Sequence, residues 1–393
     1  MNTISTTNTY AANIVAPFPI NIVQGDGSFV FDENGEKYID MATGISSVNF
    51  GHKNPKIINA LTQQLQKISV VPRLFYNEPL AKLLEKACNL TKMDKAVVMN
   101  SGAEAVETAI KIIRKWGYVA KNIPNDLAEI ITFDNSFHGR TITTIGTSSN
   151  EAYKKHFGPM PKGFKSIPIN DIHALKDAIN INTAGIIIEP IQGEGGVVLP
   201  YENYLLECQN ICKKNNILFI LDEIQTGMGR TGKNFAMEHY NLDPDGITLG
   251  KSLGGGVLAI SMFLGKNKMM KVLNPGDHGS TFGGNPLASA VAYTSICILD
   301  DDNMAEQSLI SGEFFQNELN NLNSMYIKEV RGKGLFIAIE IFPEYFEEFY
   351  KQLLGFKILS VKTRNNAIRF LPPLNIDRDV ILDAISKIKM IKI

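Results

Sequence analysis

Two apolar runs that each end in a charged residue constrain the fold of this chain more than any other feature. Ile217–Leu221 is followed by Asp222 and Glu223, and Ile247–Gly250 is followed by Lys251. Charges are rarely buried without a partner, and ligands of open α/β sheets bind at the carboxyl ends of the strands. The sequence therefore predicts two buried strands whose tips, Asp222 and Lys251, hold one cofactor between them.

Short apolar runs alternate with stretches of helical periodicity through much of the chain. Further runs typical of strands buried on both faces cover residues 96–99, 130–133 and 186–188. Apolar residues at helical spacing cover residues 54–69, 79–89, 103–119, 287–299 and 306–322. Buried strands separated by helices predict an α/β fold with a mostly parallel, doubly wound sheet.

The two ends of the chain lack this alternation of buried strands and helices, which predicts that they form a second, smaller α+β unit. Residues 1 to about 20 are polar and then proline-rich, as in an arm, and Gly25–Asp40 alternates around a turn, as in a hairpin. One more strand is expected near Gly334–Ile341. We expect an N-terminal arm and hairpin of the small domain over residues 1–50, a large cofactor-binding domain over 51–290 and a C-terminal small domain over 291–393.

Composition and charge argue against several classes of function. The 393 residues are 44% hydrophobic and 20% charged with a net charge of −1, which is ordinary for a globular enzyme and favours neither nucleic acid nor an anionic membrane as partner. No run approaches the roughly 18 apolar residues of a membrane span, and no secretory signal is recognised, which predicts a cytoplasmic protein. Cys208 and Cys212 have no His or acidic residue positioned to complete a metal site, so no metal site is expected.

The stretch Asn100–Ala105 follows a predicted strand and opens a predicted helix. Ser101, Gly102 and Ala103 are small enough for backbone N–H groups to approach an anion, and the helix dipole favours a phosphate there. A capping box, with Ser101 as the cap and Glu104 three residues later, explains the same residues. The residues alone favour neither interpretation.

Two loops that follow predicted strands carry further charged side chains. Phe137 could stack on a ring and Arg140 could clamp a carboxylate, although, taken alone, a loop with a surface arginine explains this stretch better. No carboxylate that could orient His138 is visible in the sequence, so we assign it no catalytic role. Glu189 and Glu194 lie just past another strand, and Glu194 among glycines is also compatible with a solvated loop.

These features occur together, and together they indicate pyridoxal 5'-phosphate. A lysine is protonated at neutral pH and is a poor nucleophile, which a Schiff base with an aldehyde cofactor overcomes. The pyridinium nitrogen of that cofactor needs an acidic partner so that the ring can act as an electron sink. Lys251, Asp222, the helix start at Gly102 and the ring of Phe137 meet these needs, whereas an NAD enzyme requires neither the lysine nor the aspartate.

The chain resembles the class III aminotransferases of the fold type I pyridoxal phosphate superfamily, and within them the acetylornithine and ornithine aminotransferases. The motifs that carry the resemblance run from about residue 25 to residue 385. They are NSGAEAVE, FHGRT, EPIQGEGGV, DEIQTGMGRTGK, LGKSLGGG, GDHGSTFGGNPLA, VRGKGL and IRFLPPL.

The resemblance implies a role for each residue around the cofactor ring. Lys251 would bind the cofactor aldehyde and then move the proton between the carbons of substrate and cofactor. Asp222 would pair with the ring nitrogen, Gln225 would hydrogen-bond the ring hydroxyl, and Phe137 would stack on the ring. Lys251 and Asp222 are therefore the expected catalytic residues.

The resemblance also implies how the phosphate is held and how the protein assembles. Gly102 and Ala103 would bind the phosphate through backbone N–H groups, with Ser101 beside them. Thr281 would reach the phosphate bound in a neighbouring subunit, which implies a homodimer with an active site shared across the interface. Ser280 is expected near the substrate.

Three charged residues are expected to bind substrate. Arg140 resembles the clamp for the carboxylate far from the reacting amine. Glu194 and Arg369 resemble a switch pair: Arg369 binds the carboxylate beside the reacting centre of glutamate or 2-oxoglutarate, and Glu194 neutralises it when an ω-amine donor has no carboxylate there.

The amine donor is predicted less directly. Where ornithine aminotransferases place two tyrosines, this chain carries Val15 and Ile45, which favours a bulkier or acylated donor over free ornithine. We expect transamination of the δ-amine of N2-acetylornithine to 2-oxoglutarate, giving a semialdehyde and glutamate, as in arginine biosynthesis. The alternatives are ornithine δ-aminotransferase or an aminotransferase for another ω-amine.

Overall fold

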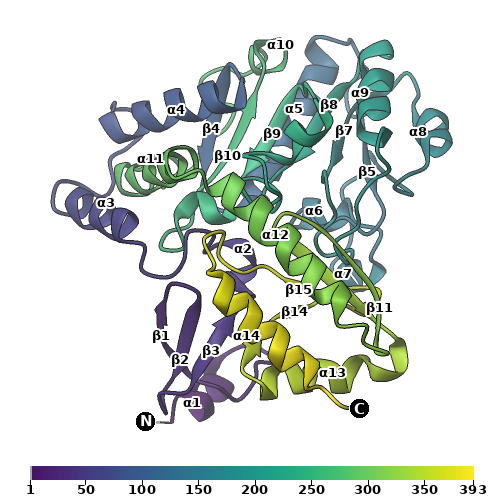
Figure 1. Ribbon diagram of the computed structural model, residues 1–393. Helices are drawn as coiled ribbons and strands as arrows, with labels where there is room; N and C mark the ends of the chain where they lie inside the picture. The colour runs from purple at the N-terminus through teal and green to yellow at the C-terminus, as the bar shows by residue number, and fades with distance from the viewer. Residues whose placement is uncertain (1) are drawn as a thin grey trace.

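The computed structural model describes residues 2–393 as a large α/β part and a smaller part built from both ends of the chain (Figure 1). A seven-stranded sheet forms the centre of the large part. Its strands are β4 (Lys95–Met99), β5 (Glu129–Phe133), β6 (Phe164–Ile167), β7 (Thr183–Ile188), β8 (Leu218–Asp222), β9 (Gly246–Leu249) and β10 (Ser261–Gly265).

The strand order is β4-β10-β9-β8-β7-β5-β6. Strand β10 runs antiparallel to both of its neighbours, and the other neighbouring pairs are parallel. The predicted α/β class with a mostly parallel sheet is therefore confirmed. Every residue of β7, β8, β9 and β10 is buried, as uninterrupted apolar runs indicate. The sequence analysis did not identify β10.

Helices cover both faces of this sheet, and successive residues of its strands alternate between them. Leu218 and Ile220 of β8 pack in the cluster under helix α5 (Gly102–Val119), whereas Phe219 and Leu221 pack in the main core on the other face. The other helices of the large part are α3 (Pro55–Leu65), α4 (Glu78–Thr91), α6 (Ile142–Gly146), α7 (Glu151–Lys154), α8 (Ile172–Ala178), α9 (Tyr204–Lys214), α10 (Asn267–Met270) and α11 (Pro286–Asp301).

The smaller part contains two four-stranded sheets. The first joins β1 (Ile22–Asp26), β2 (Phe29–Asp32) and β3 (Lys37–Asp40) to β13 (Ile358–Leu359), so the two ends of the chain share one sheet. The second has the order β11-β12-β15-β14, with bounds Ile327–Lys333, Phe336–Ile341, Ala367–Phe370 and Val361–Lys362 in that order. The helices of this part are α12 (Met304–Asn321), α13 (Phe346–Gly355) and α14 (Arg378–Lys389).

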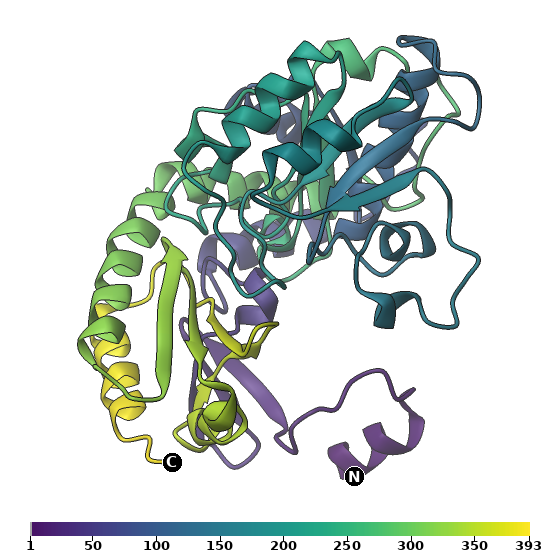
Figure 2. The same ribbon diagram turned by 90° about the vertical axis from the view of Figure 1, so that its right-hand side faces the viewer.

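The predicted hairpin is present as the antiparallel pair β2–β3. The domain boundaries at residues 50 and 290 stay a prediction; α11 spans the second of them and packs against α3 and α4. Helix α1 (Thr3–Tyr10) buries no side chain and stands apart from the body (Figure 2). The arm was expected, but its helix was not, because the sequence of α1 has no apolar stripe. Short elements complete the fold: α2 (Thr43–Ser46) and the 3₁₀ helices η1 (Ala236–Tyr240), η2 (Lys251–Gly254) and η3 (Pro343–Tyr345).

Over residues 2–393, no helix has the length and apolar character needed to cross a membrane. The expected cytoplasmic location stays a prediction.

A buried arginine joins the two parts of the molecule. Arg230 lies in the large part and is fully buried. Its Nε donates to Ser46 Oγ at 2.9 Å and its Nη2 to Asn49 Oδ1 at 2.5 Å, while its Nη1 donates to the carbonyl oxygens of Leu335 at 3.0 Å and Pro372 at 2.7 Å. The segments that carry α2, β12 and β15 are thus fixed to one guanidinium.

Candidate active site

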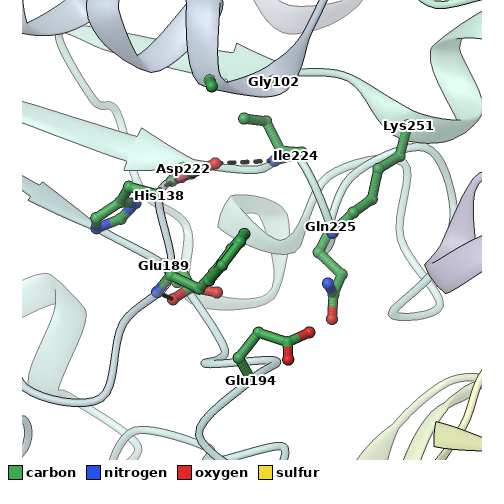
Figure 3. A pocket seen from close by; sticks show the side chains of 11 residues that line it. Gly102, His138, Glu189, Glu194, Asp222, Ile224, Gln225 and Lys251 are labelled. Atoms are coloured by element: carbon green, nitrogen blue, oxygen red, sulfur yellow. Dashed lines mark hydrogen bonds and ion pairs between the residues drawn. The ribbon is translucent and has the colours of Figure 1, made fainter. Parts of the chain in front are cut away.

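A cavity of about 200 Å³ lies beside the carboxyl ends of β7 and β8 and the first turn of α5 (Figure 3). This is the position at which open α/β sheets bind their ligands. The cavity is lined by Gly102, Ala103, Phe137, His138, Gly139, Glu189, Glu194, Asp222, Ile224, Gln225 and Lys251.

Asp222, the last residue of β8, is buried and accepts three hydrogen bonds. Its Oδ2 accepts from His138 Nδ1 at 2.6 Å, and its Oδ1 accepts from Thr248 Oγ1 at 2.8 Å and from the backbone N–H of Ile224 at 3.2 Å. Burial raises the pKa of this carboxyl, but the bonds from His138 and Thr248 and the charge of His138 outweigh burial and hold the pKa below its usual value. Asp222 therefore keeps a negative charge inside the cavity.

His138 has the carboxylate partner that could not be seen in the sequence. The sequence could not show this partner, because Asp222 follows His138 by 84 positions and only the sheet brings the two together. Burial lowers the pKa of His138, but the bond and charge of Asp222 raise it above its usual value. His138 Nε2 is buried without a hydrogen-bond partner, so its bond to Asp222 is what orients the ring.

Lys251 begins η2 and is separated from β9 by Gly250, and its side chain extends into the cavity from the side opposite His138 (Figure 3). Its φ of 49° lies in the left-handed region, a strained conformation that often marks functional positions. Burial, followed by the positive charge of Arg369, lowers the pKa of Lys251 to about 8. A substantial fraction of the amine is therefore neutral, and so nucleophilic, near neutral pH.

Of the two interpretations of the α5 start, the structure contains the capping box and leaves the phosphate site untested. Ser101 Oγ accepts from the N–H of Glu104 at 3.2 Å, and the Glu104 carboxylate accepts from the N–H of Asn100 at 2.9 Å and of Ser101 at 2.6 Å, so the capping box is confirmed. Among residues 2–393, the N–H groups of Gly102 and Ala103 find no acceptor, and both residues line the cavity. Ser101 does not line it, and the phosphate-binding role of all three stays a prediction.

Glu189 is a buried site residue to which the sequence analysis gave no role. Its Oε1 accepts from the N–H of Phe137 at 2.8 Å and its Oε2 from the N–H of Gly193 at 3.3 Å. Burial raises its pKa to about 7. Glu189 thus fixes the backbone on which the ring of Phe137 stands. An acidic residue directly after an apolar strand, the pattern that singled out Asp222, was the available signal.

Arg369 of β15 is fully buried beside the cavity and contacts two residues of the large part. Its Nη2 donates to Glu194 Oε1 at 2.8 Å and its Nη1 to Gln225 Oε1 at 2.9 Å. The expected pair of Glu194 and Arg369 is therefore in direct contact, while its role as a switch stays a prediction. A Cβ on Gly193 would lie 2.0 Å from Gln225 Oε1 and 3.1 Å from Arg369 Nη1, so a larger residue there would displace the side-chain amide of Gln225.

Besides Ser101 and Arg369, five predicted substrate or phosphate residues do not line the cavity of this single chain. Ser280 Oγ accepts from Asn100 Nδ2 at 2.7 Å, Thr281 is exposed, and the guanidinium of Arg140 lies 3.7 Å from the ring centre of Tyr153. The other two, Val15 and Ile45, are 71% and 43% exposed. The roles assigned to these residues stay predictions.

The cavity residues fit the cofactor that the sequence indicates. An ionised carboxylate at Asp222 suits the pyridinium nitrogen, and the amine of Lys251 suits the aldehyde. The unpartnered N–H groups of Gly102 and Ala103 suit a phosphate. The four groups line one enclosure.

The family model and the relatives that match this chain all belong to the aminotransferases. The family model described as "Aminotransferase class-III" matches residues 10–391. An ornithine aminotransferase of Bacillus subtilis is 47% identical over 386 residues, which cover 98% of this chain and 96% of that protein. Ornithine aminotransferase 2 of Staphylococcus saprophyticus is 46% identical over 388 residues, 99% of this chain and 98% of that protein.

Solved structures include both kinds of enzyme. The ornithine aminotransferase of Toxoplasma gondii is 39% identical with a TM-score of 0.96, and the match covers 98% of this chain and 93% of that one. The acetylornithine aminotransferase of Elizabethkingia anophelis is also 39% identical, with a TM-score of 0.88 and coverage of 98% and 97%.

The lowered pKa of Lys251 predicts how the protein without cofactor captures pyridoxal 5'-phosphate. Because burial disfavours the ammonium form, the neutral amine increases as pH rises through about 8. We expect capture at Lys251 to increase roughly tenfold per unit between pH 6 and 7 and to level off above pH 9. Borohydride trapping followed by peptide mass spectrometry measures it, with Lys251→Ala as background. A midpoint near pH 10 would contradict the assignment.

Proposed function

Because the chain belongs to the class III aminotransferases, we propose that it is an ornithine δ-aminotransferase. Its cofactor is pyridoxal 5'-phosphate, which a second structure of the Toxoplasma gondii ornithine aminotransferase holds at partial occupancy in its active site. The δ-amine of ornithine would pass to the enzyme and then to 2-oxoglutarate, giving a semialdehyde and glutamate. The observation that carries the choice of donor is the identity of 46–47% to ornithine aminotransferases over nearly the whole chain.

Four residues would hold the cofactor. Lys251 would bind its aldehyde carbon, Asp222 would face its ring nitrogen, and the N–H groups of Gly102 and Ala103 would bind its phosphate. The bound cofactor supplies an electron sink for the carbon that carries the amine. The ionised state of Asp222, maintained by its hydrogen bonds from His138 and Thr248, supports this arrangement.

Lys251 would also be the general base. Its amine would take the proton from the amine-bearing carbon of the substrate and then deliver it to a carbon of the cofactor. A base needs a pKa near the working pH, and the pKa of about 8 for Lys251 meets this condition.

Glu194 and Arg369 would allow one site to accept two kinds of substrate. An ω-amine donor brings no carboxylate to its reacting carbon, so Glu194 would remain paired with Arg369. Glutamate and 2-oxoglutarate bring a carboxylate there, which would replace Glu194. Arg369 is fully buried, and a buried charge that loses its partner costs roughly 3–5 kcal/mol. The guanidinium therefore needs an acidic partner in both halves of the reaction.

N2-acetylornithine remains the second candidate donor. It is the donor predicted from the sequence, with ornithine as the alternative, and the identity to ornithine aminotransferases supports ornithine. Val15 and Ile45 support the acetylated donor because neither offers a hydroxyl to a free α-amine, and α2, which carries Ile45, packs against the η2 segment that begins with Lys251. The match to an acetylornithine aminotransferase structure is compatible with it.

We also propose a homodimer with a shared active site. Leu74, Phe75, Tyr76 and Phe282 are large apolar side chains that are 89%, 63%, 106% and 56% exposed. Their segments are adjacent, since Asn77 Nδ2 donates to the carbonyl oxygen of Gly284, and exposed apolar patches of this kind mark protein interfaces. Thr281 lies beside Phe282 and would thus reach the partner's phosphate.

The choice of donor is tested by steady-state kinetics. We expect kcat/KM to be at least tenfold higher for ornithine than for N2-acetylornithine, which corresponds to about 1.4 kcal/mol in transition-state binding. 2-Oxoglutarate at saturation serves as the common acceptor. A tenfold preference for the acetylated donor would replace ornithine by the second candidate.

The switch is tested with Glu194→Gln, which keeps the shape of the side chain but cannot neutralise Arg369. We expect the half-reaction with the ω-amine donor to slow by about 10- to 100-fold, in line with 1.5–3 kcal/mol for a hydrogen bond to a charged group. The half-reaction with glutamate should change by less than about threefold. Stopped-flow absorbance of the cofactor follows both, and equal losses would refute the switch.

The dimer is tested with Phe75→Asp combined with Phe282→Asp. Two buried charges should prevent association, so light scattering should give the 43.4 kDa of one chain in place of twice that mass, with loss of bound cofactor. Phe157→Asp is the matched control, because Phe157 is 61% exposed outside this patch. A wild-type monomer that retains cofactor would exclude the proposal.

A further inference from the structure

Two arginines share one aromatic ring beside the cavity. Phe137 lines the cavity, and the ring of Tyr153 meets it edge-on, with ring centres 6.3 Å apart and an interplanar angle of 89°. Tyr153 itself is not among the lining residues, so its ring lies just outside. The Cζ atom of Arg140 is 3.7 Å from the centre of that ring, and the Cζ atom of Arg364 is 5.7 Å from it.

Neither of these guanidinium groups has an acidic partner. Throughout residues 2–393, no carboxylate oxygen lies within 4.0 Å of the side-chain nitrogens of Arg140 or Arg364. The one side-chain hydrogen bond of Arg364 runs from Nη1 to Asn135 Oδ1 at 2.5 Å. Arg331, in contrast, has two acidic partners: its Nη1 lies 2.6 Å from Glu329 Oε2 and 2.7 Å from Glu340 Oε2. A guanidinium has five N–H donors, so Arg140 and Arg364 can still bind an anion.

Backbone hydrogen bonds hold Arg364 next to the loop that carries Glu194, the partner of Arg369. Its N–H donates to the carbonyl oxygen of Glu194 at 3.3 Å, and Asn365 Nδ2 donates to the carbonyl oxygen of Gly195 at 3.1 Å. Strand β15, which carries Arg369, begins three residues later. The turn before β15 is therefore attached to the loop that carries Glu194. One arginine of the site, Arg369, therefore lies beside the cavity, and Arg140 and Arg364 lie at the ring of Tyr153, next to Phe137.

We propose that Arg364 acts with Arg140 to bind the outer carboxylate of a dicarboxylate oxo acid, the one far from the reacting carbon. Arg369 would take the carboxylate beside the oxo group, and a second carboxylate would reach the ring of Tyr153, where two planar guanidinium groups can donate to its oxygens. Arg364 is thus a specificity-determining residue that favours dicarboxylate over monocarboxylate acceptors. This inference rests on one part of the proposed function, namely that the amine acceptor is a dicarboxylate oxo acid. It does not depend on the identity of the amine donor.

The test uses binding without turnover. Glutarate is a dicarboxylate that lacks an oxo group, and pentanoate is its monocarboxylate counterpart of equal length. We expect Arg364→Gln to weaken glutarate binding to the holoenzyme by about 5- to 20-fold, below the full value of a charged hydrogen bond because the side chain is partly exposed. Pentanoate binding should change by less than twofold. Titration calorimetry measures both.

A matched control lies two residues away. Lys362→Gln removes the same charge from the same segment, but Lys362 pairs with Glu347 and does not contact Tyr153, so glutarate binding should stay within twofold of wild type. As a second readout, Arg364→Gln should raise KM for 2-oxoglutarate by the same 5- to 20-fold with kcat within twofold. It should leave kcat/KM for 2-oxopentanoate unchanged.

Two outcomes would overturn the proposal. Unchanged glutarate binding in Arg364→Gln would mean that the guanidinium does not contact the outer carboxylate. Equal weakening of glutarate and pentanoate would mean that Arg364 only supports the loop at Glu194. A wild-type enzyme that binds glutarate but transfers no amine from ornithine would instead refute the proposed donor and leave the role of Arg364 standing.

Discussion

The buried guanidinium of Arg230 is the constraint on which the two-part architecture depends. Its four hydrogen bonds go to neutral oxygens, and burial, with the charge of Arg369 nearby, lowers its pKa to about 9. Water cannot replace these partners. The active site needs this joint, because Lys251 and Glu194 belong to the large part and Arg369 belongs to the small one. A shift of the small part would separate Arg369 from Glu194.

The ionisable residues that line the cavity differ in their hydrogen-bond partners, and this difference sets what each residue can do. Asp222 stays ionised because His138 and Thr248 donate to it, whereas Glu189, which accepts only from backbone N–H groups, has a pKa raised to about 7 by burial. Lys251 has no hydrogen-bond partner among the described residues, which leaves its amine available. The same enclosure thus holds a stable anion and an amine that loses its proton near neutral pH.

The buried strands could be predicted because continuous apolar runs leave few other options, and the residues at their tips followed from where parallel strands end. Lys251, Asp222, Gly102 and Phe137 therefore line one cavity, as expected. Strand β10 was missed although its apolar run, Met262–Leu264, is as long as the run at residues 186–188 that did predict a strand. The partnership of His138 with Asp222 could not be seen because pairing across a sheet has no local signature. Val15 and Ile45, on which the predicted choice of donor rested, are exposed, and sequence pattern says little about the contacts of exposed residues.

Gly193 has a consequence for how this site can change. A side chain there would displace the amide of Gln225, whose Oε1 accepts from Arg369 Nη1. A substitution at Gly193 would therefore act on Arg369 indirectly, through its loss of one neutral acceptor, and would leave the contact with Glu194 as the remaining hydrogen bond of that guanidinium among the described residues.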